Sequence, residues 1–222
     1  MGGETSRSQP SVEAVGLSVR YAPDRPVLEN VTCGLEGVGI VRLDAPNGFG
    51  KTTFVEAASG YLRPTSGRLF VNGLDAHDPR SRADRRVCRS TPALHPHLSI
   101  VDHLAVAADL ASVPRSAAVE RAARFGLEEW FDTRTSALST GTTRKLWYLL
   151  CTMGRFTVAL LDEPFNGVDE ACTAEMIDEW ESWRRTALIV LVSHTIPPDL
   201  RIDSRVQLTN GPKEPPRTRT PR

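Results

Sequence analysis

The sequence has no long apolar run, few lysines and no paired cysteines. No stretch approaches the roughly 18 consecutive apolar residues of a membrane-spanning helix, so we expect the chain to cross no bilayer. Its 4 cysteines show no C-x-x-C spacing, which fits reduced thiols in the cytoplasm. Acidic and basic residues balance at 27 each, so the net charge favours neither nucleic acid nor an anionic membrane. These absences predict a cytoplasmic protein without a nucleic-acid partner.

The rest of the composition is that of an ordinary folded domain. Hydrophobic residues make up 40% and charged residues 24% of the 222 positions, enough to bury one sizeable core. Residues 1–10 and 212–222 are rich in polar, proline and glycine residues, and we expect both to be flexible tails, the second one basic. Residues 1–10 also lack the apolar centre of a signal peptide. We therefore assign a single domain to residues 11–211.

Residues 43–53, Leu-Asp-Ala-Pro-Asn-Gly-Phe-Gly-Lys-Thr-Thr, have the composition of a phosphate-binding loop. A strand-like run precedes them and a helix pattern follows, so backbone N–H groups and the helix N-terminus would favour negative charge there. Lys51 can reach the outer phosphates, and the Thr52 hydroxyl can bind magnesium. We expect phosphate contacts from Asn47, Gly48, Phe49, Gly50, Lys51, Thr52 and Thr53.

The loop departs from the strict pattern G-x-x-x-x-G-K-[ST] at one position. Ala45 stands where that pattern has its first glycine. If the position needs a positive φ, alanine costs about 1–2 kcal/mol there. Such a cost is tolerable, because the residues that would contact phosphate are kept.

Strand patterns lie on both sides of this loop. Before it, alternating apolar residues predict a half-buried strand with one face made by Val15, Leu17, Val19 and Tyr21. After it, residues 158–161 and 187–192 are continuous apolar runs, typical of parallel strands covered on both faces. Residues 77–97 show neither pattern, and we expect them to be loop.

Three helix patterns fall together at about residues 95–150. The first begins at Ser99, which forms a capping box with Asp102, the second covers residues 116–125, and the third follows Gly141. The sum predicts an α/β fold: a P-loop NTPase core with a parallel sheet, an N-terminal antiparallel β subdomain and an inserted α-helical subdomain.

Both late strands end in residues suited to phosphate chemistry. Asp162 and Glu163 follow the first run, at the edge where open α/β sheets bind ligands. Asp162 would hold magnesium, and Glu163 would act as general base toward water. His194 follows the second run at the same edge. The alternatives are a surface acid pair and a structural histidine.

Two further positions are candidates for ligand contacts. Ser139 and Gly141 lie at a helix start, where they would either cap the helix or offer a second anion site. Tyr21 lies at a strand end, where its ring would stack on a base or stand as an ordinary exposed rim tyrosine.

Taken in this order, the motifs resemble the ATP-binding subunit of the ATP-binding cassette (ABC) transporter family over about residues 12–211. Residues 138–142, Leu-Ser-Thr-Gly-Thr, stand at the family's signature motif, L-S-G-G-Q. Asp162 and Glu163 match the second nucleotide motif, residues 166–169 the D-loop that ends in Asp169, and His194 the switch histidine. Tyr21 matches the aromatic residue that stacks on adenine.

One family residue is missing. The Q-loop glutamine, which helps to hold magnesium and couples to the membrane partner, is replaced by Ser90 when Leu94 and Pro96 set the register. Serine can bind magnesium but is shorter, so hydrolysis or coupling would be weakened.

The resemblance implies an ATPase subunit that uses ATP and Mg²⁺ and powers a transporter, with Glu163 and His194 as catalytic residues. Each ATP would lie between the phosphate loop of one copy and Ser139 and Gly141 of another, in a head-to-tail homo- or heterodimer. Transmembrane permease subunits would hold this dimer at the inner face of the cell membrane. The amino-acid sequence of residues 162–169 is more typical of exporters than of importers. The alternatives are a degenerate ATP-binding partner with weak hydrolysis and a non-transport ABC protein.

Overall fold

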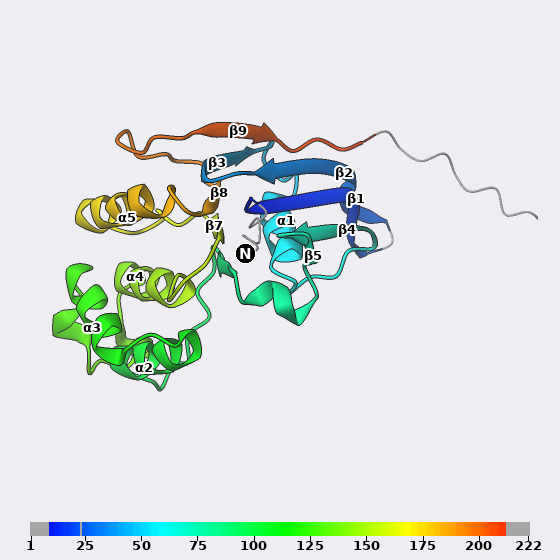
Figure 1. Cartoon of the computed structure of the whole chain (residues 1–222). Coiled ribbons are helices and arrows are strands. Elements are labelled where there is room, and N and C mark those ends of the chain that lie inside the picture. Colours follow the sequence, from blue (N-terminus) through cyan, green and yellow to red (C-terminus); the bar gives the residue numbers. More distant parts are fainter. Residues whose placement is uncertain (1–8, 23, 212–222) are drawn as a thin grey trace, which may run out of the picture.

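The computed structural model describes residues 9–22 and 24–211, which fold around two sheets (Figure 1). The first sheet is antiparallel with strand order β2-β1-β4-β5, made by β1 (Ser11–Ala22), β2 (Arg25–Glu36), β4 (Ser66–Val71) and β5 (Leu74–Asp75). The second is parallel with order β6-β7-β8-β3-β9, made by β3 (Gly39–Asp44), β6 (Arg85–Cys88), β7 (Val158–Asp162), β8 (Leu188–Val192) and β9 (Ser204–Gln207). The predicted α/β class is confirmed.

Helices cover both faces of the parallel sheet. Helix α1 (Lys51–Ala58) shares one core with the antiparallel sheet and with Val158, Leu160 and Val190. The opposite face, with Ala159 and Leu161, packs on the remaining helices: α2 (Ile100–Ala111), α3 (Arg115–Arg124), α4 (Thr140–Cys151) and α5 (Glu170–Trp183). This two-sided burial explains why both late strands are uninterrupted apolar runs.

The helices α2, α3 and α4 form a lobe beside the sheets (Figure 1). Short 3-10 turns connect and precede them: η1 (Pro79–Arg82), η2 (Glu128–Trp130) and η3 (Thr135–Ala137). The predicted capping box is confirmed, because Ser99 Oγ accepts from the Asp102 N–H and Asp102 accepts from the Ser99 N–H. None of the helices in the described ranges is long and apolar enough to span a membrane.

The first strand does not keep one register along its length. Val12, Ala14, Leu17 and Val19 are buried, whereas Val15 and Tyr21 are 45% and 59% exposed, so the predicted face was wrong at both positions. The pairing of β1 shifts between Ala14 and Leu17, at Gly16 with φ +59°, and again after Val19. A bulge inserts an extra residue and moves the following side chains to the other face.

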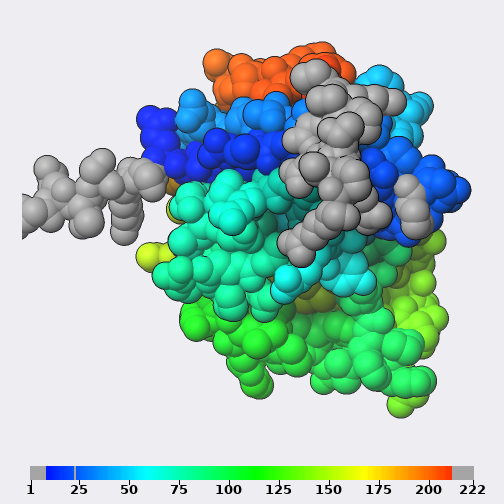
Figure 2. Space-filling view, turned by 90° about the vertical axis from the view of Figure 1, so that its right-hand side faces the viewer, coloured from blue at the N-terminus to red at the C-terminus, as the bar shows by residue number. Residues whose placement is uncertain are grey.

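Residues 77–97 are not all loop, as we expected from the sequence. They include η1 and strand β6, which pairs in parallel with β7 and lies at one edge of the sheet. Figure 2 shows this teal segment at the surface, between the blue strands and the green helices. Strand β9, at the opposite edge, was also missed. Both are 4 residues long and rich in polar residues, because an edge strand has fewer covered positions.

The expected tails, residues 1–10 and 212–222, lie outside the described residues, except for residues 9 and 10. The division into tails and domain therefore stays a prediction.

A buried ion pair joins the helical lobe to α5. Arg121 of α3 donates two hydrogen bonds to the Glu179 carboxylate, at 2.6 and 2.7 Å, and both side chains are nearly buried. Tyr148 of α4 donates its hydroxyl proton to the same carboxylate at 2.9 Å, and the Trp180 indole N–H donates to Tyr148. Three helices thus meet at one carboxylate.

Removal of this carboxylate should destabilise the fold strongly. Glu179→Ala leaves the Arg121 guanidinium buried without its partner, so we expect the free energy of unfolding to fall by about 3–5 kcal/mol. Asp178→Ala, at an exposed position of the same helix, is the control and should change it by less than about 0.5 kcal/mol. Urea unfolding measures both, and equal effects would contradict the role of the ion pair.

Candidate active site

The loop between β3 and α1 has the backbone of a phosphate cradle. The Phe49 N–H donates to the Pro46 carbonyl at 3.1 Å and closes a turn. Gly50 has φ +104°, and a Cβ there would lie 2.7 Å from a Val27 methyl group, so only glycine fits before the helix. Lys51 Nζ donates to the Ala45 carbonyl at 2.8 Å, which holds the ammonium group over the loop. The predicted phosphate-contacting residues are therefore gathered at one helix start.

The departure at Ala45 has no conformational cost. Among the described non-glycine residues, a positive φ occurs at Asn30, Asn72, Ser112 and Glu163, and not at Ala45. Ala45 packs instead against the core between the two sheets. The penalty that we considered from the sequence does not apply.

The ends of β7 and β8 bring Glu163 and His194 together. The strands are neighbours, with Asp162 paired to Val192, so the residues that follow them meet. Glu163 accepts from the His194 backbone N–H at 3.0 Å and from the Ser193 hydroxyl at 3.2 Å, and His194 Nε2 lies 3.6 Å from the carboxylate. The Glu163 backbone has φ +50°, an uncommon value for glutamate. The carboxylate is thus fixed in direction.

The role of Ser193 in holding Glu163 was missed from the sequence. Its position directly between a buried strand and His194 was the only available signal. The structure adds that it is 4% exposed and that its one hydroxyl proton is shared between the Thr195 carbonyl, at 2.7 Å, and Glu163, at 3.2 Å.

Asp162 is the most unusual polar residue of the site. It is 1% exposed, and neither carboxylate oxygen has a hydrogen-bond partner among the described residues. Burial raises its pKa above the usual value, although the nearby hydroxyls of Thr52 and Ser90 oppose the shift without completing a hydrogen bond. A buried carboxylate facing two hydroxyls suits Mg²⁺, which binds oxygen ligands and often takes only one or two carboxylates from the protein. These three residues fit that cation.

Thr52 and Ser90 also line a small pocket of about 180 Å³. Glu56 and residues 89–93 complete its wall. Tyr21 also contacts α1: its hydroxyl is 3.1 Å from Thr53 Oγ1 and donates to Glu56 at 3.3 Å. Its ring is largely exposed beside the loop helix, as a base-stacking residue would need.

The remaining predicted residues, Ser139, Gly141 and Asp169, lie near one another. In this structure Ser139 and Asp169 make hydrogen bonds within the protein, mainly at helix starts. Ser139 caps α4 by accepting from the Thr142 N–H, and its side chain is exposed. Gly141 lies against the Gly167 carbonyl, where a Cβ would be 3.1 Å away. Asp169 caps α5 and pairs with Lys145 at 2.6 Å; the Lys145 hydrogen bond is the largest cause lowering its pKa. Their contacts with a nucleotide stay a prediction.

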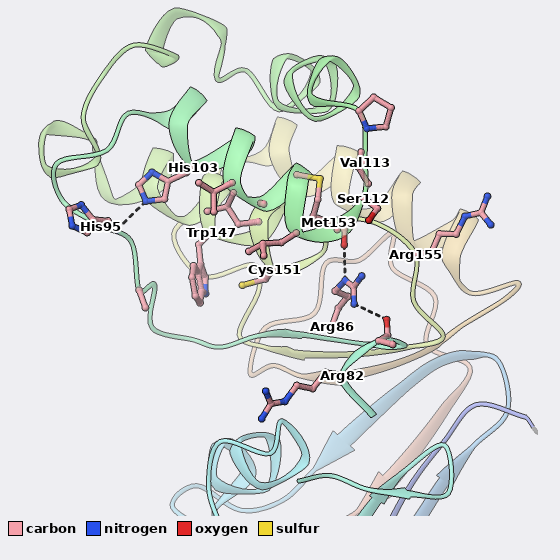
Figure 3. Close-up of a pocket in the computed structure, with 18 of the residues that line it drawn as sticks. Arg82, Arg86, His95, His103, Ser112, Val113, Trp147, Cys151, Met153 and Arg155 are labelled. Carbon is pink, nitrogen blue, oxygen red and sulfur yellow. Dashed lines mark hydrogen bonds between the residues drawn. The ribbon is translucent and has the colours of Figure 1, made fainter. Parts of the chain in front are cut away.

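A second, larger cavity lies away from the phosphate loop. It is a groove of about 1150 Å³ between the helical lobe and the segment around η1 and β6. Figure 3 shows Arg82, Arg86 and Arg155 on one side and Trp147 and His103 on the other. The exposed side chains Val106 and Leu110 belong to the helical wall. The arginine side also carries Asp84, so this wall is net positive, whereas the other wall is mainly apolar.

The profile of the family described as ABC transporter matches residues 28–166, more than half of the chain. The chain belongs to the ABC transporter family. It is similar to the spermidine/putrescine import ATP-binding protein PotA of Legionella pneumophila, with 27% identity over 192 residues, which are 83% of this chain and 53% of PotA. It is also similar to ATP-binding cassette sub-family A member 13 of Homo sapiens, with 28% identity over 92% of this chain and 4% of that protein.

Solved structures agree with this family. The structure titled "Structure of ATP binding subunit of ABC transporter" is 26% identical, covers 90% of this chain and 86% of its own, and superposes with a TM-score of 0.77. This chain spans about half the length of PotA and a small fraction of the human protein.

The buried carboxylate gives a pH-dependent prediction. An amide costs less to bury than a carboxylate, so without nucleotide and Mg²⁺ we expect Asp162→Asn to raise the free energy of unfolding at pH 7 by about 1–2 kcal/mol. Because the pKa of Asp162 is raised in the folded state, the folded protein binds more protons than the unfolded chain, and the natural protein gains stability as the pH falls.

The advantage of Asp162→Asn should therefore shrink as the pH falls from 7 toward about 4, the ordinary carboxyl value. Urea unfolding at several pH values measures the difference. Asp199→Asn, at an exposed position, is the control. An Asp162→Asn advantage that does not vary with pH would mean that the ionised carboxylate is not the cause.

Proposed function

We propose that the chain is an ATP-hydrolysing subunit that powers a transporter. The observation that supports this best is the fixed Glu163 carboxylate, which follows the buried Asp162 at the end of β7, in the same sheet as the strand β3 that leads into the phosphate loop. Such an arrangement suits attack of water on the last phosphate of ATP. The family supports ATP as the ligand.

In this proposal each residue has one role. Lys51 leaves the Ala45 carbonyl and contacts the outer phosphates, while the loop N–H groups surround them. Asp162, Thr52 and Ser90 would hold Mg²⁺, which would supply positive charge next to the phosphate oxygens. Glu163 accepts a proton from water as general base, and the hydrogen bonds from Ser193 and His194 keep its carboxylate aimed.

We further propose that two copies close on ATP. Ser139 and Gly141 lie at the exposed start of α4, and Ser139 makes its hydrogen bonds within that segment. A nucleotide bound to a second chain can therefore reach them. The N-terminus of a 12-residue helix favours phosphate. The partner copy is either identical or a related subunit, and Tyr21 stacks on the adenine ring.

The membrane partners are permease subunits, and the groove beside the helical lobe suits them. A helix with acidic residues on one side and apolar residues on the other would match its basic wall and the exposed Leu110. The protein would then lie in the cytoplasm against the inner face of the membrane, held there by these partners.

The direction of transport has two candidates. The amino-acid sequence of residues 162–169, together with Ser193 before His194, supports export. Import is the alternative, since PotA is named as an import protein. A degenerate ATP-binding partner with weak hydrolysis is the alternative for activity, and Ser90 together with the altered signature motif favours it.

Loss of the loop lysine should weaken ATP binding strongly. In Lys51→Ala the phosphates lose a charged hydrogen bond, which ordinarily contributes roughly 1.5–3 kcal/mol, so binding should weaken at least about tenfold. Arg185→Ala, which removes an exposed positive charge, is the control and should bind normally. Titration with a fluorescent ATP analogue measures both. Undiminished binding by Lys51→Ala would place the phosphates elsewhere.

Turnover tests the general base separately from binding. Glu163→Gln keeps the shape of the side chain but cannot accept the proton from water, so hydrolysis should fall by roughly 10²–10⁴-fold while ATP still binds. Glu128→Gln, at an exposed position, should hydrolyse normally. Unchanged turnover by Glu163→Gln in the complex with the permease would make the assigned base wrong. Binding without turnover by the natural chain would support the degenerate alternative.

A further inference from the structure

The segment Arg89–Ser90, which follows β6, is attached to helix α4 by two side chains. We propose that these two side chains, from Arg144 and Trp147, are positioning residues that set Ser90 at the magnesium site. The proposal rests on the proposed function, because it concerns how the same site binds its cation.

Arg144 contacts two of the segments around the site. Its Nη1 donates to the Ser90 backbone carbonyl at 3.1 Å. Its side-chain stem packs under Gly167, since a Cβ on that glycine would lie 3.3 Å from Arg144 Cδ. The guanidinium group therefore ties the Ser90 backbone to the segment that follows Glu163.

Trp147 holds the preceding peptide. Its indole Nε1 donates to the Arg89 carbonyl at 2.8 Å. The ring lies one helical turn from Arg144 and lines the groove, where Figure 3 shows it on the helical wall. Arg89 is fixed from its other end as well, because its guanidinium lies 4.8 Å from the centre of the Tyr61 ring. Two successive carbonyls are thus bonded to one helix.

A short side chain makes this attachment necessary. Serine carries its hydroxyl on a single carbon, so its backbone must lie close to the cation and can correct little by rotation. The parallel pairing of Cys88 with Leu161 brings the segment after β6 beside the end of β7, where the Ser90 hydroxyl lies near Asp162, and Ser90 shares the small pocket with Thr52. Fixing the Arg89 and Ser90 carbonyls leaves the hydroxyl as the group that faces Asp162.

The same contacts join the groove to the cation. Trp147 lines the groove with its ring and holds the Arg89 carbonyl with its N–H. An occupant of the groove that moved this ring would move Ser90. The affinity for Mg²⁺ would then depend on whether the groove is occupied.

The test compares Arg144→Gln and Trp147→Phe with two matched controls. Trp147→Phe keeps an aromatic ring but lacks the N–H, and Trp130→Phe makes the same change at an exposed tryptophan. Arg185→Gln removes an exposed positive charge, as Arg144→Gln removes one near Ser90. ATP binding is titrated first with a chelator and then at increasing Mg²⁺, so no turnover is needed.

We expect each positioning variant to need roughly fivefold more Mg²⁺ for half-maximal enhancement of ATP binding, the factor that one hydrogen bond ordinarily contributes. ATP binding in the chelator should be unchanged. Hydrogen exchange of the free protein should also quicken at residues 89–91. Arg144→Lys, which keeps a donor, should recover part of the Mg²⁺ affinity. The controls should match the natural chain.

Three outcomes would overturn the proposal. If the variants need no more Mg²⁺ than the natural chain, Arg144 and Trp147 do not position Ser90, while the proposed function stands. If binding in the chelator falls as much as binding with Mg²⁺, their effect is a general loss of folding. If the natural chain binds no ATP, the proposed function fails and this proposal fails with it.

Discussion

The placement of strand β8 between β3 and β7 is the constraint on which the active site depends. All 5 of its residues are buried, with α1 and the antiparallel sheet on one side and the helices on the other. Side chains that are close-packed on both faces hold such a strand in one register against its neighbours. That register pairs Asp162 with Val192, so the residues that follow both strands must meet. The hydrogen bonds of Glu163 follow from this pairing.

The same burial means that, without a cation, the site lowers the stability of the folded protein. Asp162 is a carboxylate with no hydrogen-bond partner among the described residues, and Glu163 has a backbone angle rarely adopted by glutamate. Features of this kind cost free energy and persist where the surrounding fold holds them. A cation between Asp162, Thr52 and Ser90 would satisfy the buried oxygens, so binding and folding would favour one another.

Helix α4 connects the site to the rest of the molecule. Its N-terminus carries the exposed Ser139, its first turns hold the Ser90 backbone through Arg144, and its later part shares the Glu179 carboxylate with Arg121. An element bonded at several points along its length moves as a unit. Changes at the groove would therefore reach the cation site through this helix.

The sequence by itself determined the α/β class, the phosphate loop, both central strands and the capped start of α2, because each depends on a local pattern of residues. It did not reveal the polar edge strands β6 and β9, whose pairing depends on neighbours distant in the chain, or the bulge at Gly16, where β1 also changes its pairing with the distant strand β4. Tertiary structure alone decided that Ala45 is unstrained, that Ser193 holds Glu163, and that Arg144 reaches Ser90. A hydrogen bond across 54 residues leaves no local pattern, because only the packing of α4 beside β6 brings its two ends together.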